Sequence, residues 1–112
     1  MKPSDRVARW VGDLESTLDA AALLVDRGRD EFDLDPALPF AFEALCNRVG
    51  DLAKRLVAAD PNRFADPIWS QAARNRDFVV HHYDRLDADA LWNTVSRSFP
   101  ELRASLATTG MV

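Results

Sequence analysis

The chain has 112 residues, 47% of them apolar, and one cysteine, so we expect a single folded domain over residues 1–112 and exclude an internal disulfide or a cysteine-based zinc site. The formal net charge of −4 argues against a protein that coats nucleic acid with a broad basic face, although a small basic cleft for a few phosphates is compatible with it. No segment approaches the roughly 20 apolar residues of a membrane span, and the first ten residues lack the apolar run of a signal peptide. We therefore expect a cytoplasmic protein with no membrane association.

The first predicted helix is capped by Ser4 or Asp5 and ends at Gly28. Its apolar residues recur at steps of three and four, which is the period of a helix with one buried face. They are Val7, Val11, Leu14, Leu18, Ala21 and Val25. We expect residues 29–36, which contain four acids, to form a solvated loop.

Pro36 and Pro39 open a second predicted helix, because proline is favoured in the first helical turn. Its apolar stripe comprises Leu38, Phe42, Leu45, Val49, Leu52 and Leu56. Cys46 lies beside this stripe, and we interpret it as a small buried residue rather than a reactive thiol.

A third helix is predicted from Asp66 as the capping residue and Pro67 as the first helical position, and a fourth from Asp87 as its cap. Leu91, Val95 and Phe99 form the inward face of the fourth. Ser98 and Glu101 have capping-box spacing around Pro100, which predicts a break and a short last helix ending near Ala107. The predicted fold is all-α: an up-and-down bundle of four long helices plus a short C-terminal helix.

The third helix leads into "RNRDFVVHHYDRLD", residues 74–87, which concentrates the chain's two histidines and its only tyrosine. Asp77 and His81 are four positions apart, so an aspartate on the same face can fix the histidine tautomer. Arg76 and His81 diverge by about 140° on a regular helix. They can converge if the helix frays near residue 82, if the long arginine wraps around, or if a second copy of the helix lies opposite in a homodimer.

Arginine grips phosphate with a planar fork of donors, and histidine transfers protons near neutral pH. Together they suit metal-free cleavage of RNA. Surface charge is the competing interpretation of such a pair. The two adjacent histidines give only weak support for a metal site, because neighbouring side chains on a helix point about 100° apart and do not converge on one ion. We interpret Trp10, Trp69 and Trp92 as packing residues rather than base-stacking platforms.

The segment "RDFVVHHY", Arg76 to Tyr83, resembles the R-x4-H-x-Y signature of HEPN-domain ribonucleases, specifically the HepT-like branch. The flanking sequence is similar too. "VGDLAKRL" resembles the second-helix segment of the family, Trp69 matches a tryptophan common there, and "LDADALWNTVSRSFPEL" resembles the stretch after the tyrosine. The similarity covers roughly residues 40 to 105.

The resemblance implies a homodimeric helical bundle with a composite cleft at its interface, acting as a metal-independent endoribonuclease toxin of a toxin–antitoxin pair. It implies no cofactor and no metal. The implied antitoxin is an MntA-like minimal nucleotidyltransferase that inactivates the toxin by AMPylation of a tyrosine. Carried over, Arg76 and His81 are catalytic, Asp77 supports them, and Tyr83 is the modified residue.

The sequence also departs from the family pattern. Arg74 lies seven residues before His81, which is the wrong spacing for the motif, and is either an RNA phosphate contact or surface charge. His82 occupies a variable position and is a weaker candidate for RNA contact. The alternative function is a non-catalytic helical module that binds the substrate of a nucleotidyltransferase or serves as its partner. A domain that only dimerises is the third possible function.

Overall fold

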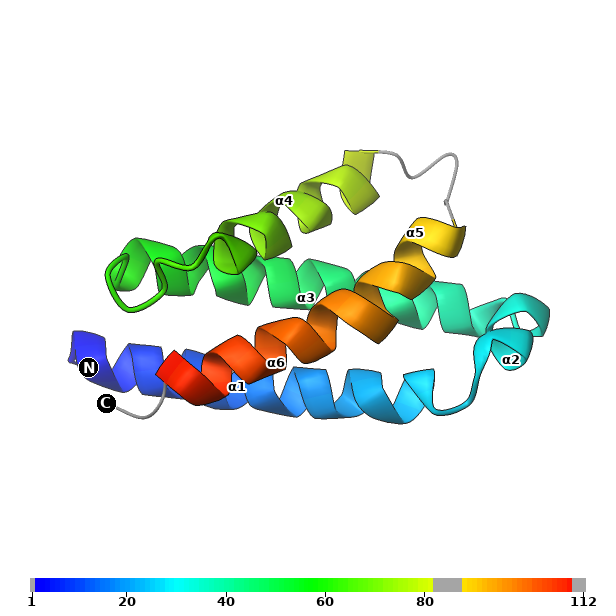
Figure 1. The fold of residues 1–112 in the computed structure, drawn as a ribbon, viewed down its shortest axis with the longest axis horizontal. Helices are drawn as coiled ribbons and strands as arrows, with labels where there is room; N and C mark the ends of the chain where they lie inside the picture. The colour runs from blue at the N-terminus through cyan, green and yellow to red at the C-terminus, as the bar shows by residue number, and fades with distance from the viewer. Residues whose placement is uncertain (1, 82–87, 110–112) are drawn as a thin grey trace.

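The computed structural model describes residues 2–81 and 88–109, and for Pro3 and residues 75–81 it describes the backbone alone. Two long antiparallel helices form one side of the molecule and are joined through a short helix (Figure 1). These elements are α1 (Pro3–Val25), α2 (Arg29–Leu34) and α3 (Ala37–Ala59).

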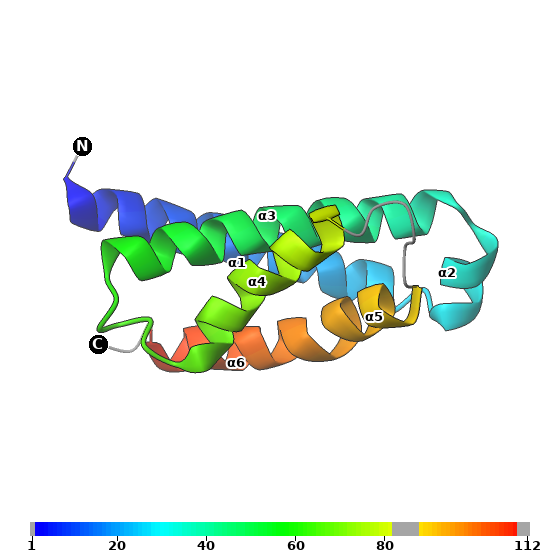
Figure 2. The ribbon, with the colours of Figure 1, turned by 90° about the horizontal axis from the view of Figure 1, so that it is seen from above.

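The second half of the chain completes the bundle. A fourth helix covers one side of α3, and the last helical segment lies alongside α1 (Figures 1 and 2). The elements are α4 (Pro67–His81), α5 (Ala88–Asn93), the π-helical turn η2 (Thr94–Ser98) and α6 (Phe99–Thr109). The predicted all-α bundle of four long helical segments is confirmed.

The core consists of the apolar stripes that the sequence predicts. Every stripe position in the first two long helices is buried or half-buried, and so is the inward face of the last segment. Each fully buried Val, Leu or Phe side chain contributes about 1.5–3 kcal/mol to folding. The most deeply buried apolar side chains are Leu14, Ala21, Phe32, Phe42, Val49, Ala53, Leu56, Trp69 and Leu102.

The start of α1 differs from the prediction. The helix begins at Pro3, with Lys2 as the flanking residue, so neither Ser4 nor Asp5 caps it. Proline has no N–H to satisfy and its φ is already helical, which allows the helix to begin there without a side-chain cap. At the other end, Gly28 follows α1 with a φ of +88°, a left-handed conformation that glycine adopts without a steric penalty.

The prediction of a loop over residues 29–36 was wrong for most of that segment, because α2 forms there. Its acids pair with arginines one turn away: Arg27 Nε lies 2.8 Å from Glu31 Oε2, and Arg29 Nε lies 2.8 Å from Asp33 Oδ1. Phe32 supplies the apolar anchor, with its ring centroid 4.8 Å from that of Phe42. The helix therefore buries an aromatic ring and leaves its charged side in water.

The predicted short last helix is confirmed, because α6 begins at Phe99 next to Pro100, but no interruption of the helical backbone separates it from the preceding elements. Helical structure continues from Ala88 to Thr109 through η2, and the Phe99 N–H donates to the Thr94 carbonyl five residues earlier. A proline inside a regular α-helix collides with the carbonyl four residues before it. The wider turn immediately before Pro100 relieves that conflict, so the helix continues instead of ending.

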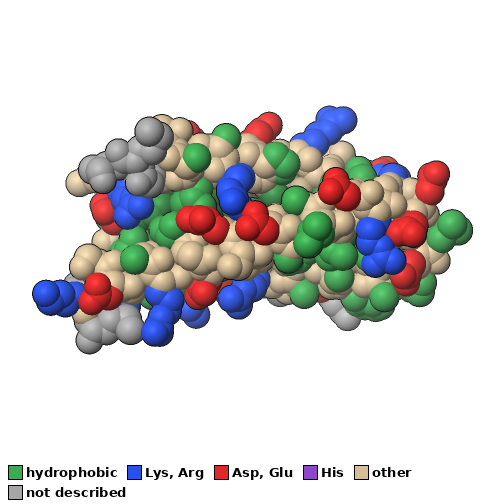
Figure 3. All heavy atoms as spheres, turned by 90° about the horizontal axis from the view of Figure 1, so that it is seen from below, with side chains coloured by type: hydrophobic (Ala, Val, Ile, Leu, Met, Phe, Trp, Pro, Cys, Tyr) green, Lys and Arg blue, Asp and Glu red, His purple; other side chains and the backbone are tan. Residues whose placement is uncertain are grey.

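The face that carries α1 and α6 mixes both signs of charge with apolar side chains (Figure 3). One ion pair links the two helices there: Arg103 Nη1 lies 2.7 Å from Asp19 Oδ1. Within the part of the chain that the structure describes, no helix combines the length and apolar character needed to cross a bilayer.

Candidate functional site

The amino end of α4 is fixed as the sequence predicts. Asp66 Oδ1 accepts a hydrogen bond of 3.0 Å from the Ile68 N–H, which caps the helix in front of Pro67. Trp69 is fully buried, packs edge-on against Phe64 at 4.8 Å between ring centroids, and donates from Nε1 to Ser105 Oγ at 3.2 Å. The indole therefore attaches the start of α4 to α6, which sets the direction of the helix.

From this anchor α4 runs obliquely across the bundle, beginning beside α6 and ending over α3 (Figure 2). Its backbone is α-helical through His81, and so Arg76, Asp77 and His81 all lie on one continuous helix. The structure places Arg74 on the exposed surface of the same helix. His82 and Tyr83 lie outside the described residues, as does the predicted cap Asp87.

Helical spacing separates the two principal positions. Residue 81 follows residue 76 by five positions, which is about 140° around a regular helix. Positions 77 and 81 instead continue, at steps of three and four, the stripe that begins with the exposed Ser70 and Arg74. Position 76 falls seven residues after the buried Trp69, on a different stripe.

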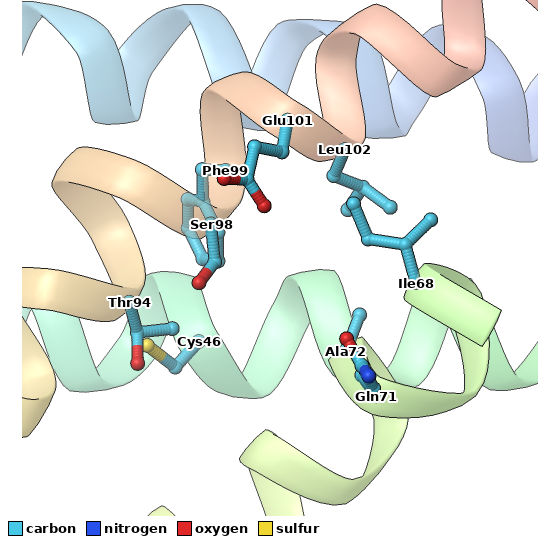
Figure 4. A pocket seen from close by; sticks show the side chains of 9 residues that line it. All are labelled: Cys46, Ile68, Gln71, Ala72, Thr94, Ser98, Phe99, Glu101 and Leu102. Atoms are coloured by element: carbon cyan, nitrogen blue, oxygen red, sulfur yellow. The ribbon is translucent and has the colours of Figure 1, made fainter.

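A small pocket lies between α4, α3 and the η2–α6 segment (Figure 4). Hydroxyl groups of Thr94 and Ser98 line one side of it, and Gln71 of α4 lines the other. Thr94 Oγ1 donates to the Ala90 carbonyl at 2.8 Å. The sequence did not indicate this pocket, because a π-turn leaves no residue pattern that distinguishes it from α-helix.

The Cys46 thiol faces the same pocket but is unsuited to nucleophilic chemistry. It is buried, and burial together with the nearby Glu43 raises the pKa of the thiol to about 12. The thiol is therefore protonated at neutral pH, whereas a nucleophile needs the thiolate. The interpretation of Cys46 as a small buried residue is confirmed.

Two buried acceptors on α3 were also not predicted. Glu43 Oε2 and Asn47 Oδ1 are inaccessible to water and have no hydrogen-bond partner within the described parts of the chain. They are four residues apart and so share one face of the helix. Their only sequence signal was two polar residues beside an apolar stripe, which surface positions also produce.

A helical bundle with Arg76 and His81 near the end of its third long helix is typical of HepT-like HEPN ribonucleases. Comparison with family models assigns the class directly, because the family described as "Ribonuclease HepT-like" matches residues 14–108. The chain belongs to the HepT-like family.

Individual relatives agree with this assignment. The chain is 27% identical over 93 residues to "Putative RNase TTE0752" of Caldanaerobacter subterraneus subsp. tengcongensis, covering 80% of this chain and 83% of that protein. It is 29% identical over 98 residues to "Probable ribonuclease HepT" of Thermococcus cleftensis, covering 80% and 86% of the two chains. A third relative, "Putative RNase MJ0127" of Methanocaldococcus jannaschii, is 28% identical over 87 residues, which cover 78% of this chain and 72% of that one. The search of solved structures found no significant match to the chain.

Proposed function

We propose that this member of the ribonuclease family is a metal-independent endoribonuclease toxin that cleaves RNA at a cleft formed where two copies meet. The observation that carries the proposal is the family match over residues 14–108, which includes the whole of α4 with Arg76, Asp77 and His81. The proposed catalytic residues are Arg76 and His81, and Asp77 supports the histidine.

The proposed reaction needs only proton transfer and charge stabilisation. A neutral His81 takes the proton of a ribose 2′-hydroxyl, and the 2′ oxygen attacks the adjacent phosphorus while the bond to the 5′ oxygen breaks. Arg76 stabilises the negative charge that develops on the phosphoryl oxygens. His81 of the second copy, in its protonated form, donates a proton to the leaving 5′ oxygen.

The homodimer is part of the proposal because one helix does not aim both groups at one atom. Positions 76 and 81 lie on different stripes of a regular α4. The side of α4 that includes Ser70, Gln71 and Arg74 is exposed, and α4 lies across the bundle from α1 (Figure 1). A two-fold axis along this exposed side brings the histidine stripes of the two copies together, and the long side chain of Arg76 then has to reach the shared cleft around its own helix.

Incubation of the purified protein with single-stranded RNA, with and without a chelator of divalent cations, tests the proposal. We expect equal degradation in both samples, because neither proton transfer nor arginine binding to phosphate requires a metal ion. Product sizes are measured on a denaturing gel. Cleavage that the chelator abolishes would contradict the mechanism.

The proposed regulation acts on Tyr83. A cytoplasmic MntA-like nucleotidyltransferase antitoxin transfers AMP from ATP to the tyrosine oxygen, which loses its proton while pyrophosphate leaves. The added AMP brings bulk and negative charge two positions after His81 and repels RNA phosphate. Intact-mass measurement after co-expression with such a partner should show added AMP that maps to Tyr83. Active AMP transfer that leaves this tyrosine unmodified would exclude it as the regulated residue.

A non-catalytic module that binds substrate for a nucleotidyltransferase is the alternative, and one observation favours it. The net charge of −4 weakens long-range attraction of RNA. Growth arrest on expression that disappears in a His81→Ala variant is expected of the toxin alone. The binding module should leave growth unaffected in both forms.

A further inference from the structure

A depression outside the proposed catalytic residues lies where the start of α1 meets the end of α3. Five residues line it, namely Arg6, Trp10, Arg55, Ala58 and Ala59. Its volume is about 410 Å³, within the range of ligand pockets. The antiparallel pairing of α1 and α3 brings these residues together from positions almost fifty apart in the sequence.

Trp10 is suited to stacking because it is held in place and still accessible. The indole is half-buried and packs against the hydrophobic core, while another part of it lines the depression. Its neighbours Ala58 and Ala59 are small and exposed, so they leave the opening above it uncovered. A rigid aromatic face next to solvent is the surface on which single-stranded bases stack.

The two arginines of the depression have no ion-pair partner among the described residues, in contrast to three other arginines of this acidic chain. Arg27, Arg29 and Arg103 lie 2.7–2.8 Å from acidic partners. Arg6 and Arg55 are both exposed, and neither has a carboxylate within 4.0 Å among the residues that the structure describes. Their donors are therefore available to an anion.

We infer that this depression binds single-stranded RNA, with a base stacked on Trp10 and flanking phosphates held by Arg6 and Arg55. A single strand is favoured over a duplex because only an unpaired base can leave its neighbours and lie on an indole. The inference rests on the proposed ribonuclease function, and it assigns a place where substrate is held away from the cleavage residues.

The position of the depression predicts which substrates depend on it. It lies at the end of the bundle where α4 begins, and α4 carries positions 76 and 81 away from that end (Figures 1 and 2). The rise of a 15-residue helix is about 22 Å, so only an RNA of several nucleotides reaches both places. Cleavage of a dinucleotide should not involve the depression.

Binding of a fluorescent, unstructured RNA of about twelve nucleotides, measured by anisotropy in the full-length His81→Ala protein, tests the inference without cleavage. Arg6→Gln combined with Arg55→Gln should weaken binding about tenfold and reduce the salt slope by about 1.4, because each phosphate contact on a single strand contributes about 0.7. Trp10→Leu should weaken binding about tenfold, and Trp10→Phe much less, because a ring remains.

The matched control is Arg27→Gln combined with Arg97→Gln, which removes the same charge from exposed residues outside the depression. Equal weakening by the two double variants would overturn the site, since only overall charge would then matter. Unchanged affinity in a Trp10→Leu protein with a native circular dichroism spectrum would overturn base stacking. Tighter binding of a duplex than of the single strand would overturn the preference for an unpaired base.

Cleavage assays separate this inference from the proposed function. Wild-type protein that cleaves a dinucleotide, with long-RNA binding unaffected by the Arg6/Arg55 variant, would overturn the inference alone. Long-RNA binding that depends on Arg6, Trp10 and Arg55 in a protein without any cleavage activity would support the inference and refute the ribonuclease. A wild-type protein that binds no RNA would overturn both.

Discussion

Replacement of His81 by alanine is expected to lower the rate of RNA cleavage by about 10²–10⁴-fold, the usual contribution of a general base or acid. The proposed mechanism uses the imidazole twice, once in each copy, and no other histidine occupies the motif position. Cleavage is measured with a fixed single-stranded RNA at saturating concentration. A variant that retains its helical circular dichroism and full activity would remove His81 from the mechanism.

Adjacent residues of identical chemistry provide matched controls. His82→Ala removes an imidazole one position further along the chain and should leave most of the activity. Arg76→Gln should abolish most cleavage, whereas Arg74→Gln removes the same group from an exposed position of α4 and should mainly weaken RNA binding. If His82→Ala and Arg74→Gln abolished cleavage while the variants of His81 and Arg76 remained active, the catalytic residues would instead be His82 and Arg74.

Trp69→Ala is expected to lower the free energy of unfolding by about 3–5 kcal/mol, because it empties the space of the largest fully buried side chain. The variant also loses the edge-on contact with Phe64 and the hydrogen bond to Ser105. Urea denaturation followed by circular dichroism measures the change. RNA cleavage should fall as well, since the indole attaches the beginning of α4.

Less severe variants keep this prediction testable where Trp69→Ala does not fold. Ser105→Ala leaves the buried indole N–H without its acceptor and should cost about 1–3 kcal/mol. Leu34→Ala truncates an 83% exposed side chain and should change stability by less than about 0.5 kcal/mol. A Trp69→Ala protein as stable as the Leu34→Ala protein would show that the indole does not anchor α4.

The long helices of this protein are predictable because burial selects one face of each. Apolar residues at steps of three and four identify α1 and α3 without further information, and Asp66 followed by Pro67 marks the start of α4. Helix α2 escaped prediction because its residues are mostly charged. Its stability depends on the contact of Phe32 with Phe42, a partner that local sequence does not reveal.

The candidate site is predictable from the sequence only as a set of residue types. Arg76 and His81 indicate a phosphate-binding and a proton-transferring residue on the same helix, and the structure extends α4 through both positions. The depression at Arg6, Trp10 and Arg55 could not be predicted, because its two halves come from distant segments. Trp10 was interpreted as a packing residue, and part of its ring does pack against the core, while another part lines the depression.

The widened turn η2 also changes how this segment tolerates differences in length. A π-turn contains one more residue than an α-turn that rises by the same distance along the helix axis. The helices on either side therefore keep their orientation despite the extra residue. Leu91 and Leu102, on either side of it, both face the core. Deleting one residue from 94–98 would restore regular spacing, and Pro100 would then collide with the preceding turn.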